Sequence, residues 1–303
     1  MSDRVTREYD LITLLTDFGA EGGYVAACEA TLAFLRPEAR VLHVSHEVSV
    51  GDISEGATVL ARIAPLCPVA VHVAVVDPGV GTGRRPVALL AQRGDLLVGP
   101  DNGLLMPAMQ ALGGGVEGWI LDRERVRARA GLSERSDSST FDGRDLFSPA
   151  AALLSAGIDA AELAGSADLT SLVRAPHCEP KTDSLGVIAQ VIEVDRFGNI
   201  GLALPFDDFT PTGAAVDVDV LGEDVPQWTA RFVRTYGELS AGELGLYRDS
   251  WGQAALALNG ASAGEVLGVR RGMLIRISPG SSRGAATVRS GGASQPSAPM
   301  EEL

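Results

Sequence analysis

The sequence is poor in aromatic residues and in positive charge, and both shortages limit what it can encode. Aromatic residues make up 5% of the 303 residues and hydrophobic residues 46%, so the core must be built from Ala, Val and Leu. The 25 Lys and Arg residues are outnumbered by 39 Asp and Glu, which leaves a net charge of −14. Because nucleic acids and anionic membranes bind cationic surfaces, this balance argues against both as partners.

Cysteine is scarce, and long hydrophobic runs are absent. Cys28, Cys67 and Cys178 form neither a CxxC pair nor a zinc-binding spacing, which favours reduced thiols in a cytoplasm over a disulfide framework. The first residues lack the apolar segment of a signal peptide, and no run reaches the length of a membrane span. We therefore expect a cytoplasmic protein without a membrane segment or a metal site.

The first 150 residues alternate between β-like and helical segments. Strands are predicted at 11–15, 40–44, 69–76, 87–91 and 95–98, and helices at 22–35, 52–63 and in the alanine-rich segment that ends near 156. The polar segment 123–139 is predicted to be a loop. Such alternation is typical of an α/β fold in which helices flank both faces of a mainly parallel sheet.

The pattern changes after the proline-containing segment 176–184, which is the predicted domain boundary. Short β-like segments follow at 186–194, 214–220, 228–233, 244–247 and 254–258, with no long helix between them. These segments predict a small antiparallel β domain. We expect an N-terminal α/β domain over 1–178, the β domain over 184–278, and a disordered tail over 279–303, where Ser, Gly, Ala and Pro dominate.

The stretch 73–85 places a lone carboxylate, Asp77, at the end of a buried strand, before a glycine-rich turn and two arginines, Arg84 and Arg85. Open α/β sheets bind small molecules at the carboxyl ends of their strands, so Asp77 is a candidate site residue. The alternative is an ordinary turn with solvated arginines. The glycine spacing also fits the loop of S-adenosylmethionine-dependent methyltransferases, but that loop should open a helix, and here a strand is predicted to follow.

Two other clusters carry groups suited to a nucleoside. Asp17 ends the first predicted strand, where an acidic residue can accept hydrogen bonds from two ribose hydroxyls; a helix cap is the alternative. Asp195, Phe197 and Asn199 combine a carboxylate, an aromatic face and an amide within five residues. An amide can recognise an adenine edge with a donor and an acceptor. A simple hairpin turn is the alternative here.

Seven motifs, taken in order, resemble the S-adenosyl-L-methionine (SAM) hydroxide adenosyltransferases, the family related to fluorinase and chlorinase. They are Leu15-Thr-Asp17-Phe-Gly19, Ser45-His46-Glu47-Val48, Val76-Asp77-Pro-Gly-Val-Gly81 with Arg84, Pro100-Asp-Asn102-Gly-Leu-Leu105, Phe141-x-Gly143-Arg144-Asp145, Asp195-Arg-Phe-Gly-Asn199 and Asn259-Gly-Ala-Ser262. The resemblance covers residues 11–277. It implies a seven-stranded α/β domain, a C-terminal β-barrel, and a homotrimer with the site between subunits.

The resemblance also implies a reaction, the hydrolysis of SAM to adenosine and L-methionine by attack of water or hydroxide on the ribose C5′. SAM is the substrate, and no cofactor is implied. The leaving thioether is neutral, so the difficulty lies in the nucleophile, because bulk water has a pKa of ~15.7. In the family an Asp, an Arg and a His align and activate the water. Asp77 and Arg84 match the first two by position, and Arg85 is the next candidate if the register slips by one.

Asp142 stands where the family has its catalytic His, and none of the four histidines lies in that motif. Asp77 and Asp142 near one arginine would form a carboxylate pair that still acts as a base toward water and disfavours an incoming halide. Gly51 stands where the family usually has an aromatic residue. The alternatives are an impaired protein that only binds SAM or adenosine, and, less favoured, a halogenase or a methyltransferase. Asp142 as a mere cap of the next turn is also open.

The same matching predicts the substrate-binding residues. They are Asp17, Phe141, Asp195, Phe197, Asn199, Tyr247 and Ser250. Asp17 would bind the ribose hydroxyls, Phe197 and Asn199 the adenine, and Asp195 the methionine ammonium group. Tyr247 and Ser250 would lie near the methionine portion or the base. We expect Asp17 and Asp77 of one chain to meet Asn199 of another.

Overall fold

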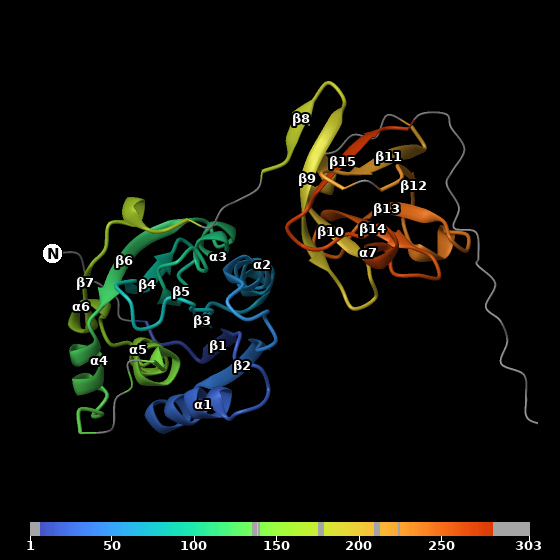
Figure 1. Cartoon of the computed structure of the whole chain (residues 1–303). Coiled ribbons are helices and arrows are strands. Elements are labelled where there is room, and N and C mark those ends of the chain that lie inside the picture. The colour runs from blue at the N-terminus through green and yellow to red at the C-terminus, as the bar shows by residue number, and fades with distance from the viewer. Residues whose placement is uncertain are drawn as a thin grey trace, which may run out of the picture. The chain divides into compact units, whose positions relative to one another are not determined.

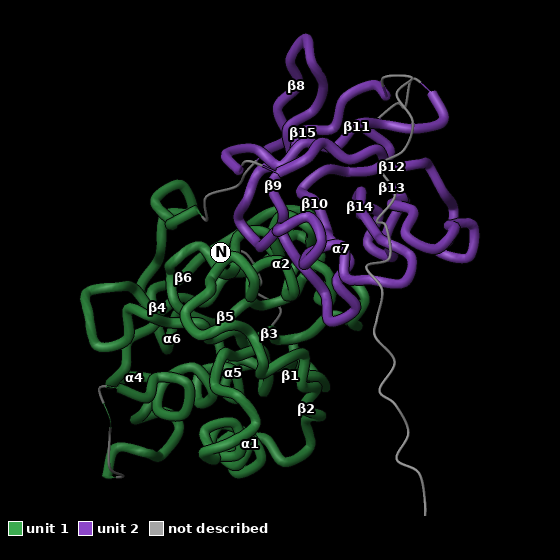
Figure 2. Tube along the Cα trace, turned by 45° about the vertical axis from the view of Figure 1, so that its right-hand side comes forward, with its two compact units in different colours: residues 1–177 green, residues 178–303 purple. Residues whose placement is uncertain are grey.

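The chain is divided between an N-terminal unit, residues 1–177, and a C-terminal unit, residues 178–303 (Figure 2). The computed structural model describes residues 7–134, 138, 140–174, 179–208, 213–223 and 225–280. The tail predicted over 279–303 lies outside these residues, except that Pro279 ends a strand and Gly280 follows it. None of the helices in the described ranges has the length and apolar character that a membrane span requires.

In the described part of the N-terminal unit, seven strands form a sheet in the order β2-β1-β3-β5-β4-β6-β7 (Figure 1). They are β1 Leu11–Thr16, β2 Arg40–Ser45, β3 Val71–Val75, β4 Pro86–Ala91, β5 Leu96–Pro100, β6 Gly115–Leu121 and β7 Ala164–Ser166. Strands β2, β1, β3 and β5 pair in parallel, whereas β4, β6 and β7 join through antiparallel pairs. Strand β4 is antiparallel to both β5 and β6, so β6 runs in the same direction as β5. The mainly parallel sheet is confirmed.

Helices cover both faces of this sheet, as predicted (Figure 1). Helices α1 (Tyr24–Leu35), α4 (Arg123–Arg129), α5 (Ser148–Ser155) and α6 (Ala160–Leu163) pack on one face, and α2 (Ile53–Ile63) and α3 (Met106–Ala111) on the other. Short 3-10 turns span Ala64–Leu66 and Leu169–Ser171. Strand β3 shows why both faces are covered. Val71, Val73 and Val75 point into one apolar core, Ala74 and Val76 into the other, and all are buried.

The prediction of a loop over 123–139 is wrong in its first part, which forms α4. Asp122 accepts a hydrogen bond from the backbone N–H of Arg125 and caps this helix, and Val126 is fully buried beneath it. Strand β6 was also not predicted, because Gly115 and Gly118 weaken its pattern. Both glycines lie under Leu169, whose methyl carbons would lie 3.2 and 2.9 Å from added Cβ atoms. Close packing explains these strand glycines.

Seven strands of the C-terminal unit close into a barrel, in the order β10-β14-β13-β12-β11-β15-β9, with β9 paired back to β10. They are β9 Gly186–Val194, β10 Ile200–Pro205, β11 Ala215–Val220, β12 Trp228–Phe232, β13 Leu244–Arg248, β14 Gln253–Leu258 and β15 Leu274–Pro279. Strand β8, Lys181–Asp183, extends β9 as a hairpin, and short helical turns span Phe206–Asp208, Tyr236–Glu238 and α7 Ala263–Val266.

The predicted β-barrel is therefore confirmed, with one difference in strand direction. All of its pairs are antiparallel except that between β12 and β13, which is parallel. Strands β8, β10 and β15 were not predicted. The interior is aliphatic except for Trp228, as the composition requires, with side chains such as Ile200, Val218 and Leu256 fully buried.

Candidate active site

Asp17 and Asp77 follow the ends of adjacent parallel strands. Thr16 pairs with Val75 across β1 and β3, so the two carboxylates emerge at the same edge of the sheet. Asp17 Oδ2 accepts a hydrogen bond of 2.8 Å from the backbone N–H of Gly51. Gly51 has a φ of 72°, which favours glycine and lets the loop before α2 approach Asp17.

Asn102 fastens a third strand end to this edge. It lies just after β5, and its Nδ2 donates to the carbonyl of Val76 at 2.8 Å, immediately before Asp77. Its Oδ1 accepts from the backbone N–H of Leu104 at 3.1 Å. The sequence motif gave Asn102 no role, and the structure makes it a brace for the loop that carries Asp77.

Asp77 and Arg84 form a buried ion pair across the glycine turn. Arg84 Nε and Nη2 both donate to Asp77 Oδ2, at 2.8 and 2.5 Å. The Asp77 side chain is only 5% exposed. Burial alone would lower the pKa of Arg84, but hydrogen bonds and charges from Asp77 and Asp142 outweigh it and raise that pKa. Arg84 therefore stays a cation at any working pH.

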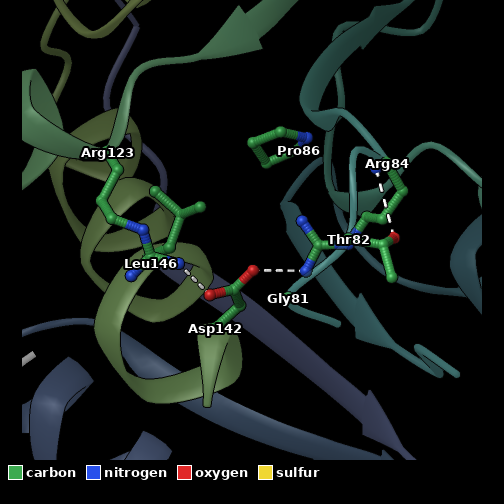
Figure 3. Close-up of a pocket in the computed structure, with 7 residues that line it drawn as sticks. All are labelled: Gly81, Thr82, Arg84, Pro86, Arg123, Asp142 and Leu146. Carbon is green, nitrogen blue, oxygen red and sulfur yellow. Dashed lines mark hydrogen bonds and ion pairs between the residues drawn. The ribbon is translucent and has the colours of Figure 1, made fainter. Parts of the chain in front are cut away.

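Asp142 joins the same cluster from the other side (Figure 3). Its Oδ2 accepts from Arg84 Nη2, and its Oδ1 accepts from Arg123 Nη2. Asp142 immediately precedes a π-helical turn, Gly143–Phe147, which leads into α5, and such turns are frequent at functional sites. Within the described residues its side chain makes no capping hydrogen bond, so its interpretation as a mere turn cap is wrong. Two arginines, rather than one, hold it.

One carboxylate oxygen of this cluster accepts no hydrogen bond from the described residues. Among the residues that the structure describes, Asp77 Oδ1 has no hydrogen-bond partner, although it is buried. A buried carboxylate oxygen without a donor is costly, so the position calls for a water or ligand donor.

A cavity of about 590 Å³ adjoins the cluster, a size within the range of small-molecule sites. Its lining residues are Gly81, Thr82, Arg84, Pro86, Arg123, Asp142 and Leu146. In Figure 3 Arg84 and Arg123 lie on opposite sides of Asp142.

Arg85 has a different task from Arg84. Its Nε donates to Asp101 Oδ2 at 2.8 Å, and its guanidinium also donates to the carbonyl and hydroxyl of Ser171 at 2.7 and 3.0 Å. Asp101 Oδ1 in turn accepts from the backbone N–H of Val173 at 2.8 Å. Arg84 is thus the arginine that contacts Asp77, and Arg85 fastens the start of β4 to a neighbouring segment.

Phe141 belongs to an aromatic cluster beside Asp142. Its ring packs edge-on against Phe18 and Tyr24, with centroids 5.8 and 5.2 Å away, and the guanidinium of Arg144 lies 5.1 Å from its centroid. Phe18 and Tyr24 were absent from the predicted set, although Phe18 follows Asp17 in the first motif.

In the C-terminal unit, four predicted substrate-binding residues line one pocket of about 130 Å³. These four are Asp195, Asn199, Tyr247 and Ser250, and the pocket is also lined by Glu193, Gly201, Tyr236, Asp249, Trp251 and Ala255. Tyr236 Oη donates to Tyr247 Oη at 2.9 Å. Burial, and then the hydrogen bond with Tyr236, raise the pKa of Tyr247, so this phenol stays protonated.

The Asp195–Asn199 turn is built by its own carboxylate. Asp195 Oδ1 accepts from the backbone N–H groups of Phe197 and Asn199, both at 2.9 Å, and Oδ2 accepts from Asn199 Nδ2 at 2.8 Å. Gly198 has a φ of 82°, and an added Cβ would lie 2.2 Å from Ser262 Oγ, so two of the sequence motifs pack against each other here. Phe197 is 77% exposed on this unit.

Comparison with known proteins identifies the family. Residues 12–164 match the model of the SAM hydroxide adenosyltransferase N-terminal domain, and residues 189–276 match that of the C-terminal domain. The chain belongs to the SAM hydroxide adenosyltransferase family. The family resemblance read from the motifs is confirmed.

Individual relatives of this SAM hydroxide adenosyltransferase family member cover nearly its whole length. A Salinispora tropica protein named (R)-S-adenosyl-L-methionine hydrolase is 42% identical over 89% of this chain and 98% of the relative. The crystal structure of an uncharacterized conserved protein from Thermotoga maritima matches with a TM-score of 0.77 at 30% identity, covering 88% of this chain and 99% of that one. A fluorinase from Actinoplanes sp. is 24% identical over 88% of this chain and 97% of its own.

No described histidine contacts the acid–arginine cluster, which consists of Asp77, Arg84, Asp142 and Arg123, in this adenosyltransferase family member. His72 is fully buried within the sheet, where its ring nitrogens lie 2.8 Å from Thr13 Oγ1 and 3.1 Å from Asp95 Oδ1. His46 hydrogen-bonds Thr16 Oγ1 at 2.8 Å and His43 at 2.8 Å. His177 lies outside the described residues. Within those residues, no group of three or more His, Cys, Asp or Glu side chains is placed to hold a metal ion.

Proposed function

We propose that this chain is an enzyme that hydrolyses S-adenosyl-L-methionine to adenosine and L-methionine. Four relatives at 35–43% identity are named (R)-S-adenosyl-L-methionine hydrolase. The observation that carries the proposal is the Asp77–Arg84–Asp142 cluster, which lies beside a cavity and leaves Asp77 Oδ1 buried without a partner among the described residues.

The chemistry fits these groups. A water oxygen forms a bond to the ribose C5′ as the C5′–S bond breaks, and that bonding pair goes to sulfur, which becomes a neutral thioether. The water loses one proton, which Asp77 Oδ1 accepts as general base. Arg84 stays charged and fixes the other oxygen of Asp77, so the basic oxygen keeps one direction. Alignment of water with the breaking bond supplies the rest of the rate enhancement.

The substrate-binding residues are divided between the two units, and this supports a proposed homotrimer. The N-terminal unit carries Asp17 and Phe141, and the C-terminal unit carries the pocket lined by Asp195, Asn199 and Tyr247. We propose that one subunit supplies Asp17 and the acid–arginine cluster to each site, and that another supplies the Asp195–Asn199 turn. Asp17 then binds the ribose hydroxyls, and Phe197 and Asn199 bind the adenine.

Subunit mixing tests this assembly. Asp77→Asn and Asn199→Ala each disable every site of a homotrimer, but they lie on different chains of a shared site. Mixed trimers should therefore regain activity, because some sites receive both wild-type residues. No recovery after mixing under conditions that exchange subunits, or a monomer of full activity in analytical ultracentrifugation, would overturn the shared site.

The reaction itself is tested with each sulfonium epimer of SAM in ¹⁸O-labelled water. We expect equal amounts of adenosine and methionine, with ¹⁸O in the adenosine 5′-hydroxyl, and no loss of activity after treatment with a chelator. No adenosine above a heat-treated control with either epimer rejects the proposal. Binding without turnover would indicate a binding protein, and S-adenosylhomocysteine would indicate methyl transfer. A cytoplasmic location is also proposed, on the free buried thiols of Cys28 and Cys67.

A further inference from the structure

We propose that Arg123 is a positioning residue for this reaction. It holds the Asp142 carboxylate, which holds Arg84 against Asp77. The inference rests on the proposed hydrolysis. It concerns a residue that none of the sequence motifs contains.

Extending the β4–β6 register beyond both strands places Arg123 opposite Arg84. Val87 of β4 pairs with Ile120 of β6 in an antiparallel ladder. Continuing that register by three residues from this pair, two residues past the end of each strand, sets Arg84 across from Arg123. Like charges opposite each other are destabilising. Asp142 lies between the two guanidinium groups and accepts one of them on each oxygen, which removes the repulsion (Figure 3).

The result is a chain of alternating charges, Asp77–Arg84–Asp142–Arg123. Two carboxylates and two guanidiniums balance, although Asp77 and Asp142 are each only 5% exposed. A carboxylate that is bonded through both oxygens cannot rotate, so Asp142 fixes Arg84 Nη2. Arg84 in turn fixes Asp77 Oδ2, and this sets the direction of Oδ1, the oxygen without a partner in the described part of the chain. The position of the proposed base thus depends on Arg123.

Arg123 is itself held by the local fold and lies at the border of the site. It is the first residue of α4, directly after the capping residue Asp122. Its side chain is 30% exposed and lines the cavity. Removing its guanidinium would leave Asp142 with one arginine, shared with Asp77, and free to turn. A loosened base misaligns the water, and misplacement by about 1 Å can cost about 10²-fold in rate.

The first test compares Arg123→Met, which removes the guanidinium but keeps much of the stem, with Arg123→Lys. Arg129→Met is the matched control, since Arg129 lies on the same helix, 47% exposed and paired with Glu162 at 3.5 Å. We expect Arg123→Met to lower kcat by about 10²-fold with little change in KM. Lysine should recover part of that loss because it keeps the charge. Arg129→Met should match the wild type.

The second test is a double-mutant cycle with Asp142→Asn. If Arg123 acts through Asp142, adding Arg123→Met to Asp142→Asn should lower kcat little further. The inference would be overturned if the two substitutions lowered kcat by independent factors that multiply in the double variant. A wild-type kcat in Arg123→Met would also overturn it. Circular dichroism and urea unfolding check the fold, and if Arg123→Met does not fold, the Lys variant is carried through the same cycle. A wild type without adenosine production rejects the proposed function and this inference together, whereas an active wild type with insensitive Arg123 variants rejects only this inference.

Discussion

Replacing Asp77 by Asn removes the proposed base while leaving most of its contacts in place. The Asn carbonyl oxygen can still accept from Arg84, which now donates to Asp77 Oδ2 through Nε and Nη2. The new amide nitrogen takes the place of Oδ1, the buried oxygen without a partner in the described structure. Asn cannot accept a proton there, so the variant tests the chemical step with little change in shape.

The expected loss lies in kcat. A positioned general base contributes about 10²–10⁴-fold, which is about 3–5 kcal/mol of barrier at 1.36 kcal/mol per tenfold. The effect on KM should be much smaller, because the charge of Asp77 is already paired with Arg84 and contributes little net field at the cationic sulfonium. Exchanging a charged acceptor for a neutral one in the two bonds from Arg84 should cost about 1–2 kcal/mol of stability.

Adenosine formation at saturating SAM measures kcat, calorimetry of adenosine binding measures the intact pocket, and urea unfolding measures stability. A kcat of Asp77→Asn within about threefold of the wild type would contradict the role of Asp77 as general base, because a base should contribute a much larger factor. A large rise in KM with unchanged kcat would equally refute it, because Asp77 would then bind the sulfonium and not activate water.

Four further changes are predicted. Arg85→Met should leave kcat unchanged but lower the free energy of unfolding by about 1–3 kcal/mol, since the buried Asp101 loses its cation. Phe197→Ala should weaken adenosine binding by about 10-fold or more in calorimetry, because stacking on a base is worth about 1–3 kcal/mol. The urea midpoint of unfolding should not change, because the Phe197 side chain is exposed. Gly198→Ala should destabilise the C-terminal unit by about 2–5 kcal/mol in urea, from the positive φ and a Cβ 2.5 Å from a neighbouring Cα. Burial raises the pKa of Asp95, but hydrogen bonds from Arg93, His72 and a backbone N–H outweigh it and lower that pKa below 3.8. As the pH falls, the unfolded chain therefore binds a proton at Asp95 before the folded chain does, and the free energy of unfolding should decrease below about pH 4. The Asp95→Asn variant should show a shallower dependence of this free energy on pH.

The α/β order of the N-terminal unit could be predicted because its strands are buried on both faces. Continuous aliphatic segments such as Val71–Val75 occur where helices cover both sides of a sheet, and every predicted strand lies within two residues of an observed one. The pairing of Asp77 with Arg84 in the turn after β3 could also be predicted, since both residues lie in one short motif. Local sequence therefore located the two residues whose contact is local.

Arg123 could not be found in this way, because its contact with Asp142 depends on tertiary register. It comes near Arg84 because β4 pairs with β6, and the glycines of β6 made that strand hard to predict from the sequence. The charged start of α4 then made the following residues resemble a loop. A missed strand and a missed helix thus concealed the same side chain. The motifs thus predicted the contact between Asp77 and Arg84 but not the side chain that holds Asp142 from the other side.

The closeness of Arg84 and Arg123 also limits which side chain suits position 142. A neutral imidazole, the group that the motif resemblance implies at this position, accepts one hydrogen bond and would leave Arg84 and Arg123 without a full counter-charge. A carboxylate accepts from both and balances them, so Asp142 and Arg123 form a matched pair. We expect this pairing to favour water over a halide as the nucleophile of the proposed reaction. Both guanidiniums are already engaged by carboxylates. A halide would be repelled by Asp77 Oδ1, which has no hydrogen-bond partner among the described residues, whereas water can donate a hydrogen bond to it.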